Sequence, residues 1–421
     1  MPGPQQPELV NPVPVEEVND WARSMATTFL IDQAARPIEA WTGQLTDRWD
    51  PHRAWGARDR GQWVATLRTE PRRLTVPAPA GQRAEVAVDA LTNVTVAATH
   101  RRQGLMSRML DGSLRDARDR GEALSVLIAA EWPIYGRFGY APATTSCDYV
   151  LHRSRPGARV AGDMTGIRMV ELEAVVPLAV EVFDRARWRW AGQIDRDELW
   201  WQRNLGLDGG VARRPAPPNW LIHEGDEGLD GILGWTPEGE PSLLTPAHRA
   251  VVSGLFAATD AAYRDLWSYL TAIDGIDQVS LSDRPMHEPV RWLLEDGRTL
   301  IATRQVDFLW ARLLDVPAAL SARRYAIPGE LVLEVSDPDG AGFAAGRYRL
   351  LGGPDGSECE RTDREPDVVI SQRALASIYL GGHRLAELRV IGAAIERTPG
   401  SLERLDLMFS WPTPPWNATW F

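Results

Sequence analysis

The sequence of 421 residues contains no lysine, so its 46 basic residues are all arginines. A Walker phosphate-binding loop and a Schiff-base enzyme both need a lysine amine, and the absence of lysine excludes these two classes. The arginines are scattered among 57 acidic residues, and the net charge is −11. Because a nucleic-acid-binding protein usually carries a basic stripe, this distribution argues against a nucleic-acid partner.

Cysteine and long apolar runs are also scarce. Cys147 and Cys359 lie far apart without a nearby cysteine, so we expect neither a disulfide framework nor a metal site. No apolar run approaches the roughly 18 residues of a membrane-spanning helix, and the proline-rich start lacks the basic and apolar regions of a signal peptide. We therefore expect a cytoplasmic protein without a membrane partner.

The length of the chain exceeds what one ordinary hydrophobic core needs, which predicts several domains. The order of elements predicts an α/β unit over residues 1–150, a second such unit over 151–304, and an α+β unit over 305–421. Hydrophobic spacing in the first unit predicts helices and strands in alternation. The helices are expected near residues 15–25 and 102–121, and the strands near 61–67, 73–76, 85–96 and 124–129.

The second unit repeats the order of strand, helix and strand found in the first. Its expected helices cover residues 171–190 and 247–269, and its expected strands lie near 220–223, 231–235 and 278–282. The segment Thr245-Pro-Ala-His248 enters the second of these helices and offers no phosphate-binding signature. We therefore interpret this unit as a duplicated domain without a cofactor site.

The third unit is expected to alternate short strands and helices. Its strands are predicted near residues 330–335, 346–351 and 368–370, and its helices after 316–317 and over 373–381 and 399–408. A turn signal stands at Asp337-Pro-Asp-Gly340. This order resembles that of a sterol-carrier-like domain.

The segment from Val94 to Ser107 predicts a binding site for a pyrophosphate. A strand is followed by Arg101-Arg-Gln-Gly104 and then by an amphipathic helix. The first N–H groups of a helix and its partial positive charge attract phosphate, and the arginine fork suits phosphate oxygens. Glycine lets the backbone approach closely. The alternative is a solvated turn before an ordinary surface helix.

We assign these residues to acetyl-CoA as the cosubstrate. The residues expected at its pyrophosphate are Arg102, Gln103, Gly104, Leu105, Met106 and Ser107. The strand residues Val94, Thr95 and Val96 are expected to pair with the pantetheine arm, as an added strand does in peptide recognition.

Two motifs resemble the enhanced intracellular survival (Eis) family of actinobacterial N-acetyltransferases, within the GNAT superfamily. They are Ala98-Thr-His-Arg-Arg-Gln-Gly-Leu105 and Ile134-Tyr-Gly-Arg-Phe-Gly-Tyr-Ala-Pro-Ala-Thr-Thr145. Shorter matches such as Leu380-Gly-Gly-His-Arg384 extend the resemblance over nearly the whole chain. Met106 departs from the small residue that ends the GNAT signature Arg/Gln-x-x-Gly-x-Gly/Ala.

The resemblance implies two GNAT-like domains, the second without cofactor, followed by a sterol-carrier-like domain. It also implies a homo-hexamer that acetylates amines of cationic small molecules such as aminoglycosides. A protein or peptide N-acetyltransferase is the alternative acceptor class, and a lipid or sterol carrier is a less favoured function. The net charge of −11 agrees with a cationic acceptor.

The resemblance further implies roles for residues outside the first motif. Ala130 and Glu131 would contact acetyl-CoA, and Tyr135 would protonate the departing thiolate. Tyr140 is the rival tyrosine, and we prefer Tyr135 because it lies nearer the end of the preceding strand. The C-terminal carboxylate of Phe421 would enter the active site.

The last residues support a docked tail on physical grounds. The chain ends in Trp416-Asn-Ala-Thr-Trp-Phe421, and these aromatic side chains would be costly to leave exposed. An aromatic plug that only closes a domain interface is the alternative to a catalytic role. Trp41 is a further candidate for the acceptor cleft.

Overall fold

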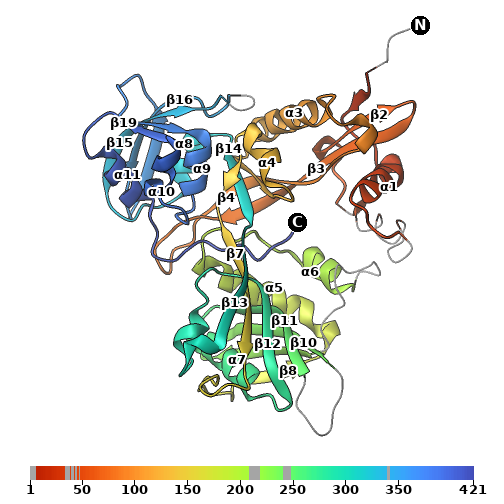
Figure 1. Cartoon of the computed structure of the whole chain (residues 1–421), viewed down its shortest axis with the longest axis vertical. Helices are drawn as coiled ribbons and strands as arrows, with labels where there is room; N and C mark the ends of the chain where they lie inside the picture. Colours follow the sequence, from red (N-terminus) through yellow and green to blue (C-terminus); the bar gives the residue numbers. More distant parts are fainter. Residues whose placement is uncertain are drawn as a thin grey trace.

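The computed structural model describes the chain except for residues 1–5, 34–37, 39–41, 43, 44, 47, 208–218, 240–247 and 339–341. It contains three β-sheets, each covered by helices, and the end of the chain lies between the first and the second sheet (Figure 1). Trp41 lies outside the described residues.

The first sheet has the strand order β1-β2-β3-β4-β5-β14-β6. Helix α3 covers one face, because its buried residues Leu105, Met109 and Leu114 recur at helical spacing. The strands expected near 61–67 and 73–76 form one continuous strand, β3. The elements are α1 (Val18–Thr28), α3 (Leu105–Asp119), α4 (Trp132–Tyr135), β1 (Glu8–Val10), β2 (Ala54–Asp59), β3 (Gln62–Thr75), β4 (Glu85–Val96), β5 (Leu124–Ile128), β6 (Ala141–Pro142) and β14 (Leu309–Leu313).

Strands β4 and β5 determine where this domain opens. They run parallel and pair only from Val88 to Ala90 and from Leu124 to Val126. Strand β4 continues to Val96 and β5 continues to Ile128. The two strands therefore leave their ladder at the middle of β4, and the remaining edge of β4 is available to a ligand.

The second sheet has the strand order β13-β7-β12-β11-β10-β9-β8. Strands β11 and β12 are parallel and are joined by α7, which repeats the arrangement of β4, α3 and β5. The elements are α5 (Val175–Ala186), α6 (Glu198–Leu205), α7 (Asp260–Ala272), β7 (Thr145–His152), β8 (Ile167–Val170), β9 (Asn219–Gly225), β10 (Gly228–Glu238), β11 (His248–Ala257), β12 (Ile276–Arg284) and β13 (Leu300–Asp307).

The prediction of a helix over residues 247–269 is wrong for the first half of that range. The segment His248–Ala257 is strand β11, and the helix begins only at Asp260. Its apolar residues Val251, Val252 and Leu255 fit a helical spacing, but β-branched residues also suit a buried strand. The segment pairs with β10 on one edge and with β12 on the other, and this pairing makes it a strand.

Two strands cross between the sheets. Strand β7 lies in the second sheet, and β14 inserts between β5 and β6 of the first sheet. The domain boundaries at residues 150 and 304 remain predictions. The structure shows in addition that strands from one predicted unit join the sheet of another. These crossings tie the units together, because β7 begins in the first predicted unit and joins the second sheet, while β14 lies in the third predicted unit and joins the first sheet.

The third sheet, with strand order β17-β16-β15-β18-β19, belongs to an α+β domain. Its core is continuous with the face of the first sheet opposite α3. Tyr325, Tyr348, Tyr379 and Phe409 fill its interior. The elements are α8 (Val316–Ala322), α9 (Gln372–Ile378), α10 (Leu385–Leu388), α11 (Ser401–Phe409), β15 (Gly329–Ser336), β16 (Gly346–Gly352), β17 (Ser357–Arg361), β18 (Val368–Ser371) and β19 (Ala394–Glu396).

Part of the expected turn at residues 337–340 falls outside the described residues. No helix in the described part of the chain has both the length and the apolar character needed to cross a membrane.

Candidate active site

A bulge in β4 marks the point where β4 and β5 separate. Two residues of β4, Asn93 and Val94, stand opposite the single Leu67 of β3, and Asn93 has a φ of +55°. The Thr66 hydroxyl donates to the Asn93 carbonyl at 2.9 Å, and Arg68 Nε donates to Asn93 Oδ1 at 3.2 Å. A β-bulge takes backbone groups out of the ladder. The backbone next to Val94 is thus held in a shape that can receive a ligand.

The unpaired edge of β4 runs from the bulge toward the end of the strand at Val96, and the N-terminus of α3 lies at this second end. Gly104 is the N-cap and has a φ of +74°, and Arg102 has a φ of +64°. Glycine offers no side chain to cap the helix, so the N–H groups of Leu105 to Ser107 are left for a ligand. Arg101 to Gly104 are exposed. This geometry fits the pyrophosphate of acetyl-CoA.

The residues expected to bind the cosubstrate come together in the structure. Val94, Val96, Leu105, Met106 and Tyr135 belong to one hydrophobic cluster. The side chain of Thr95 is instead buried, and its hydroxyl lies 2.6 Å from the hydroxyl of Thr66 on the neighbouring strand β3. Ala130 and Glu131 are exposed between the end of β5 and α4.

The second domain differs at the corresponding position. Only Ala258 and Thr259 join β11 to α7, and the Thr259 hydroxyl accepts from the Ala262 N–H at 3.1 Å. This side chain closes the helix N-terminus that Gly104 leaves open in the first domain. The counterpart of Arg101–Gly104 is therefore this short link, and not the expected segment 245–248, of which only His248 is described.

Replacing Gly104 with alanine is expected to weaken acetyl-CoA binding and to destabilise the protein by about 1–2 kcal/mol. An added Cβ at Gly104 would meet no atom within 4 Å, so the cost comes from its left-handed backbone alone. Denaturant unfolding and calorimetric titration with acetyl-CoA measure the two effects. Gly121, also left-handed and with open space around it, is the matched control. Gly121→Ala should lose similar stability and keep its affinity for acetyl-CoA, and unchanged affinity in Gly104→Ala would contradict the assignment.

The two candidate tyrosines have different surroundings. Tyr135 ends α4 and is 9% exposed, and its ring centroid lies 6.1 Å from that of Tyr140. Burial and the charge of Glu131 raise the pKa of Tyr135 to about 12. Tyr140 is fully buried, its hydroxyl lies 2.7 Å from Ser125 Oγ, and burial raises its pKa further. Tyr140 is thus engaged inside the sheet, which leaves Tyr135 as the better candidate.

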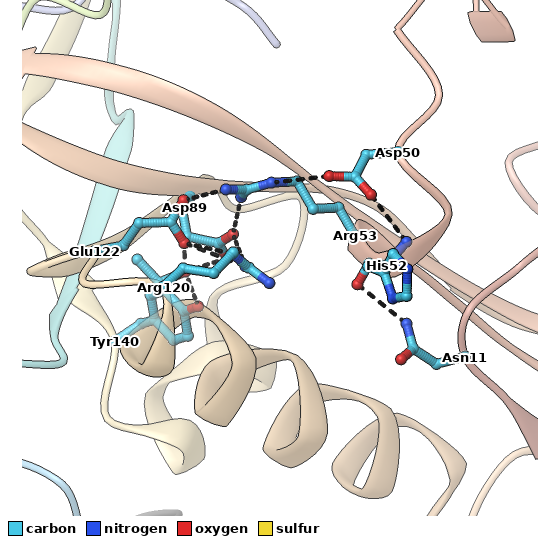
Figure 2. A network of polar contacts seen from close by, with 9 residues as sticks. Asn11, Asp50, His52, Arg53, Asp89, Arg120, Glu122 and Tyr140 are labelled. Atoms are coloured by element: carbon cyan, nitrogen blue, oxygen red, sulfur yellow. Dashed lines mark hydrogen bonds and ion pairs between the residues drawn. The ribbon is translucent and has the colours of Figure 1, made fainter.

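A buried polar network lies beneath the ladder of β4 and β5. Figure 2 shows Arg53 and Arg120 directed toward Asp89 and Glu122. Arg53 donates to Asp89 at 3.0 Å and to Glu122 at 2.5 Å, and Arg120 donates to Asp89 at 3.1 Å. The Ser125 hydroxyl donates to the Asp89 carbonyl at 3.1 Å. The sequence carried no signal for this network, because its members come from distant segments.

The network predicts a specific dependence of stability on pH. Burial and the neighbouring Glu122 raise the pKa of Asp89 to about 7. Between its unfolded pKa of about 3.9 and this value, the folded state binds the extra proton, so stability falls as pH rises by up to about 1.4 kcal/mol per pH unit. Asp89→Asn does not titrate. The unfolding free energy of the wild type minus that of Asp89→Asn should therefore fall from pH 5 to pH 7, and a difference independent of pH would refute this.

The C-terminal tail is docked, which confirms the prediction from its aromatic residues. Gln193 Nε2 donates to the Trp416 carbonyl at 2.8 Å, and the Thr419 hydroxyl donates to the Ile194 carbonyl at 2.9 Å. Trp416 is 3% exposed and Thr419 is fully buried. The tail therefore runs along the second domain before it reaches the first.

Phe421 lies next to the bulge of β4. The Thr92 hydroxyl donates to a terminal carboxylate oxygen of Phe421 at 3.1 Å, and Trp200 Nε1 donates to the Trp420 carbonyl at 2.9 Å. Thr92 directly precedes Asn93. The structure thus brings the last residue to the point where β4 and β5 separate, on the side of β4 that faces the second domain.

A cleft of about 240 Å³ opens beside Phe421. We call it the arginine cleft, because Arg48, Arg68, Arg72 and Arg203 line it together with Glu70. Burial alone would raise the pKa of Glu70, but Arg68 and Arg72 outweigh it and lower this pKa to about 2. Sequence reasoning missed these residues, although the alternation of Arg68, Glu70 and Arg72 along a strand places them on one face.

The domain families agree with the three sheets. Residues 10–143 and 192–313 each match the family described as acetyltransferase (GNAT) domain, and residues 316–418 match the sterol carrier protein domain. The expected fold class is confirmed: α/β and α+β, with two GNAT-like domains followed by a sterol-carrier-like domain.

The chain is similar to named N-acetyltransferases along most of its length. It is 37% identical to an uncharacterized N-acetyltransferase of Streptomyces avermitilis, over 98% of each chain. It is 32% identical to N-acetyltransferase Eis of Mycobacterium tuberculosis, over 82% of this chain and 83% of that protein. The crystal structure of Eis1 from Mycobacterium abscessus has a TM-score of 0.83, with 28% identity over 99% of this chain and 100% of that chain.

Proposed function

Because the chain belongs to the Eis family of GNAT N-acetyltransferases, we propose that it transfers an acetyl group from acetyl-CoA directly to the amine of a small molecule. One observation carries the proposal. The pairing of β4 with β5 ends at Ala90, the open N-terminus of α3 lies at one end of the free edge, and Phe421 lies at the other.

Acetyl-CoA would lie along this edge and supply an activated thioester. The N–H groups of Leu105, Met106 and Ser107 would hold its pyrophosphate, and Arg102, Gln103 and Gly104 would shape the turn around it. The backbone of Val94 to Val96 would pair with the pantetheine arm and stabilise charge on the thioester oxygen. Ala130 and Glu131 would border the same edge from β5. GNAT membership supports this use of acetyl-CoA.

Two groups of the chain would move protons. Tyr135 is protonated at neutral pH, as an ordinary tyrosine is, and burial raises its pKa to about 12. It would donate its proton to the sulfur as the carbon–sulfur bond breaks. The carboxylate of Phe421, with a reference pKa of about 3.3 to 3.7, would be ionised. It would orient the amine and take its proton directly or through water. The alternative is that Phe421 only closes the domain interface with its aromatic side chain.

The acceptor class needs its own test. Acetyl-CoA consumption with an aminoglycoside panel, a peptide panel and small monoamines would separate the candidates, with buffer alone as the control. Acetylation of small amines would support the proposal, and turnover restricted to peptides would favour a protein N-acetyltransferase. Absence of turnover with every amine would refute direct transfer. The homo-hexamer stays a prediction, which light scattering coupled to size-exclusion chromatography would test.

A further inference from the structure

The second domain has an opening between two parallel strands that corresponds to the opening between β4 and β5 in the first domain. The pairing of β11 with β12 ends at Val252 and Leu281, although both strands continue beyond these residues. Ser253 of β11 has no partner on β10, so a bulge marks this opening as Asn93 marks the first one. The duplicated fold therefore leaves a second gap between parallel strands, at the position that acetyl-CoA would take in the first domain.

The C-terminal tail fills this opening. The ring of Trp416 stacks on that of Phe256 from β11, with ring centroids 6.0 Å apart and ring planes inclined by 21°. The guanidinium carbon of Arg284 from β12 lies 4.7 Å from the centroid of the Trp416 ring. Trp416 is 3% exposed and contacts both strands where they separate. A side chain from the end of the chain thus takes the space that a cofactor would need in this domain.

Asp283 of β12 holds the tail through two groups. Its backbone carbonyl accepts from Trp416 Nε1 at 2.8 Å, and its Oδ2 accepts from Trp420 Nε1 at 2.9 Å. Asp283 has a left-handed backbone with a φ of +57°, a conformation that aspartate tolerates better than most residues. Trp420 directly precedes Phe421, whose terminal carboxylate accepts from Thr92 at 3.1 Å. Asp283 therefore fixes the residue next to the terminal carboxylate.

The carboxylate of Asp283 could instead serve only to stabilise the end of β12. Arg304 Nη2 donates to Asp283 Oδ1 at 3.1 Å, and Arg304 Nε donates to Asp148 Oδ2 at 2.7 Å. The backbone N–H of Asp283 donates to Asp148 Oδ1 at 3.0 Å. Arg304 thus uses Oδ1 of Asp283, whereas Trp420 uses Oδ2. The end of β12 is held by contacts other than that to Trp420, which leaves this contact to position the tail.

We propose, on the basis of the function proposed above, that Asp283 is a positioning residue for acetyl transfer. It holds Trp420 and thereby sets the place of the Phe421 carboxylate beside Thr92. The opening of the second domain is then the docking site of the tail, in the place where the first domain would bind acetyl-CoA. Loss of this hold should be costly, because a displacement of about 1 Å in a reacting group can lower the rate by about 10².

Asp283→Gly in the full-length protein tests the proposal. Glycine adopts the left-handed backbone without strain and keeps the carbonyl that accepts from Trp416, so only the contacts of the side chain are lost. With the amine that the wild type acetylates fastest as acceptor, kcat/KM should fall about tenfold. The affinity for acetyl-CoA, measured by calorimetric titration, should stay that of the wild type. Unchanged kcat/KM would overturn the proposal.

Arg304→Gln is the matched control, because it removes the partner of Asp283 Oδ1 and leaves the contact of Oδ2 with Trp420. Its unfolding free energy, measured with denaturant, should fall as in Asp283→Gly, but its kcat/KM should stay near that of the wild type. Trp420→Phe removes the donor of the hydrogen bond to Oδ2 and should lower kcat/KM as much as Asp283→Gly does. Equal losses of kcat/KM in Arg304→Gln and Asp283→Gly would show a purely structural role and would overturn the proposal.

A double variant shows whether Asp283 acts through the terminal carboxylate. When Gly-Ser-Gly follows Phe421, the carboxylate has already left its place beside Thr92. Asp283→Gly should therefore cause no further loss of kcat/KM in the extended chain. Losses that multiply would mean that Asp283 acts by another route and would overturn the proposal.

The wild type separates this inference from the function on which it rests. Acetylation by the wild type together with unchanged kcat/KM in Asp283→Gly would overturn the inference and keep direct transfer. Absence of acetylation with every amine would refute direct transfer, and the inference with it.

Discussion

Replacing Tyr135 with phenylalanine is expected to lower kcat by about 10² to 10⁴ and to leave the affinity for acetyl-CoA close to that of the wild type. The substitution removes only the hydroxyl, so the ring keeps its place in the cluster with Val94 and Met106. The hydroxyl is protonated at neutral pH, and burial raises its pKa to about 12, so it would meet the sulfur as a neutral proton donor. Steady-state kinetics and calorimetric titration with acetyl-CoA measure the two quantities.

Tyr140→Phe is the matched control, because the two rings are neighbours. It breaks the hydrogen bond to Ser125 and should cost about 1 kcal/mol of stability, without a large change in kcat. The opposite pattern would transfer the role of general acid to Tyr140. Wild-type turnover in both variants would mean that neither tyrosine protonates the sulfur.

The elements of the candidate cosubstrate site could be predicted because they are close in sequence. A strand, a turn with Gly104 and an amphipathic helix follow one another within residues 94–119, and local chemistry determines each of them. The same local reasoning went wrong at His248–Ala257. A run of apolar residues there suits a helix and a strand equally, and only pairing with distant strands decides between them.

The acceptor side depends on contacts between distant segments, which local patterns do not specify. Thr92 contacts Phe421, which comes 329 residues later, and only the resemblance to a known family suggested that the tail enters the site. Arg48 and Arg203 join the cleft from two different domains. Alternation along β3 could have shown that Arg68 and Arg72 share a face, but not that this face meets the tail.

Adding Gly-Ser-Gly after Phe421 is expected to lower kcat/KM by about 10², while the unfolding free energy stays near that of the wild type. The extension moves the negative charge away from Thr92, and a displacement of about 1 Å in a reacting group can cost this much. Trp416 and Thr419 keep their contacts with the second domain, so the tail should stay docked. The same tripeptide added at the N-terminus is the control.

Phe421→Ala distinguishes the carboxylate from the aromatic ring. This variant keeps the terminal charge and removes the side chain, which packs against the core that the first and third domains share. If the carboxylate orients the amine, the extended chain loses far more activity than Phe421→Ala, and the loss appears for every acceptor because each presents an amine. If Phe421 is only a plug, Phe421→Ala becomes the damaging change and the extension has little effect. The two variants therefore assign the last residue either to the chemistry or to the packing.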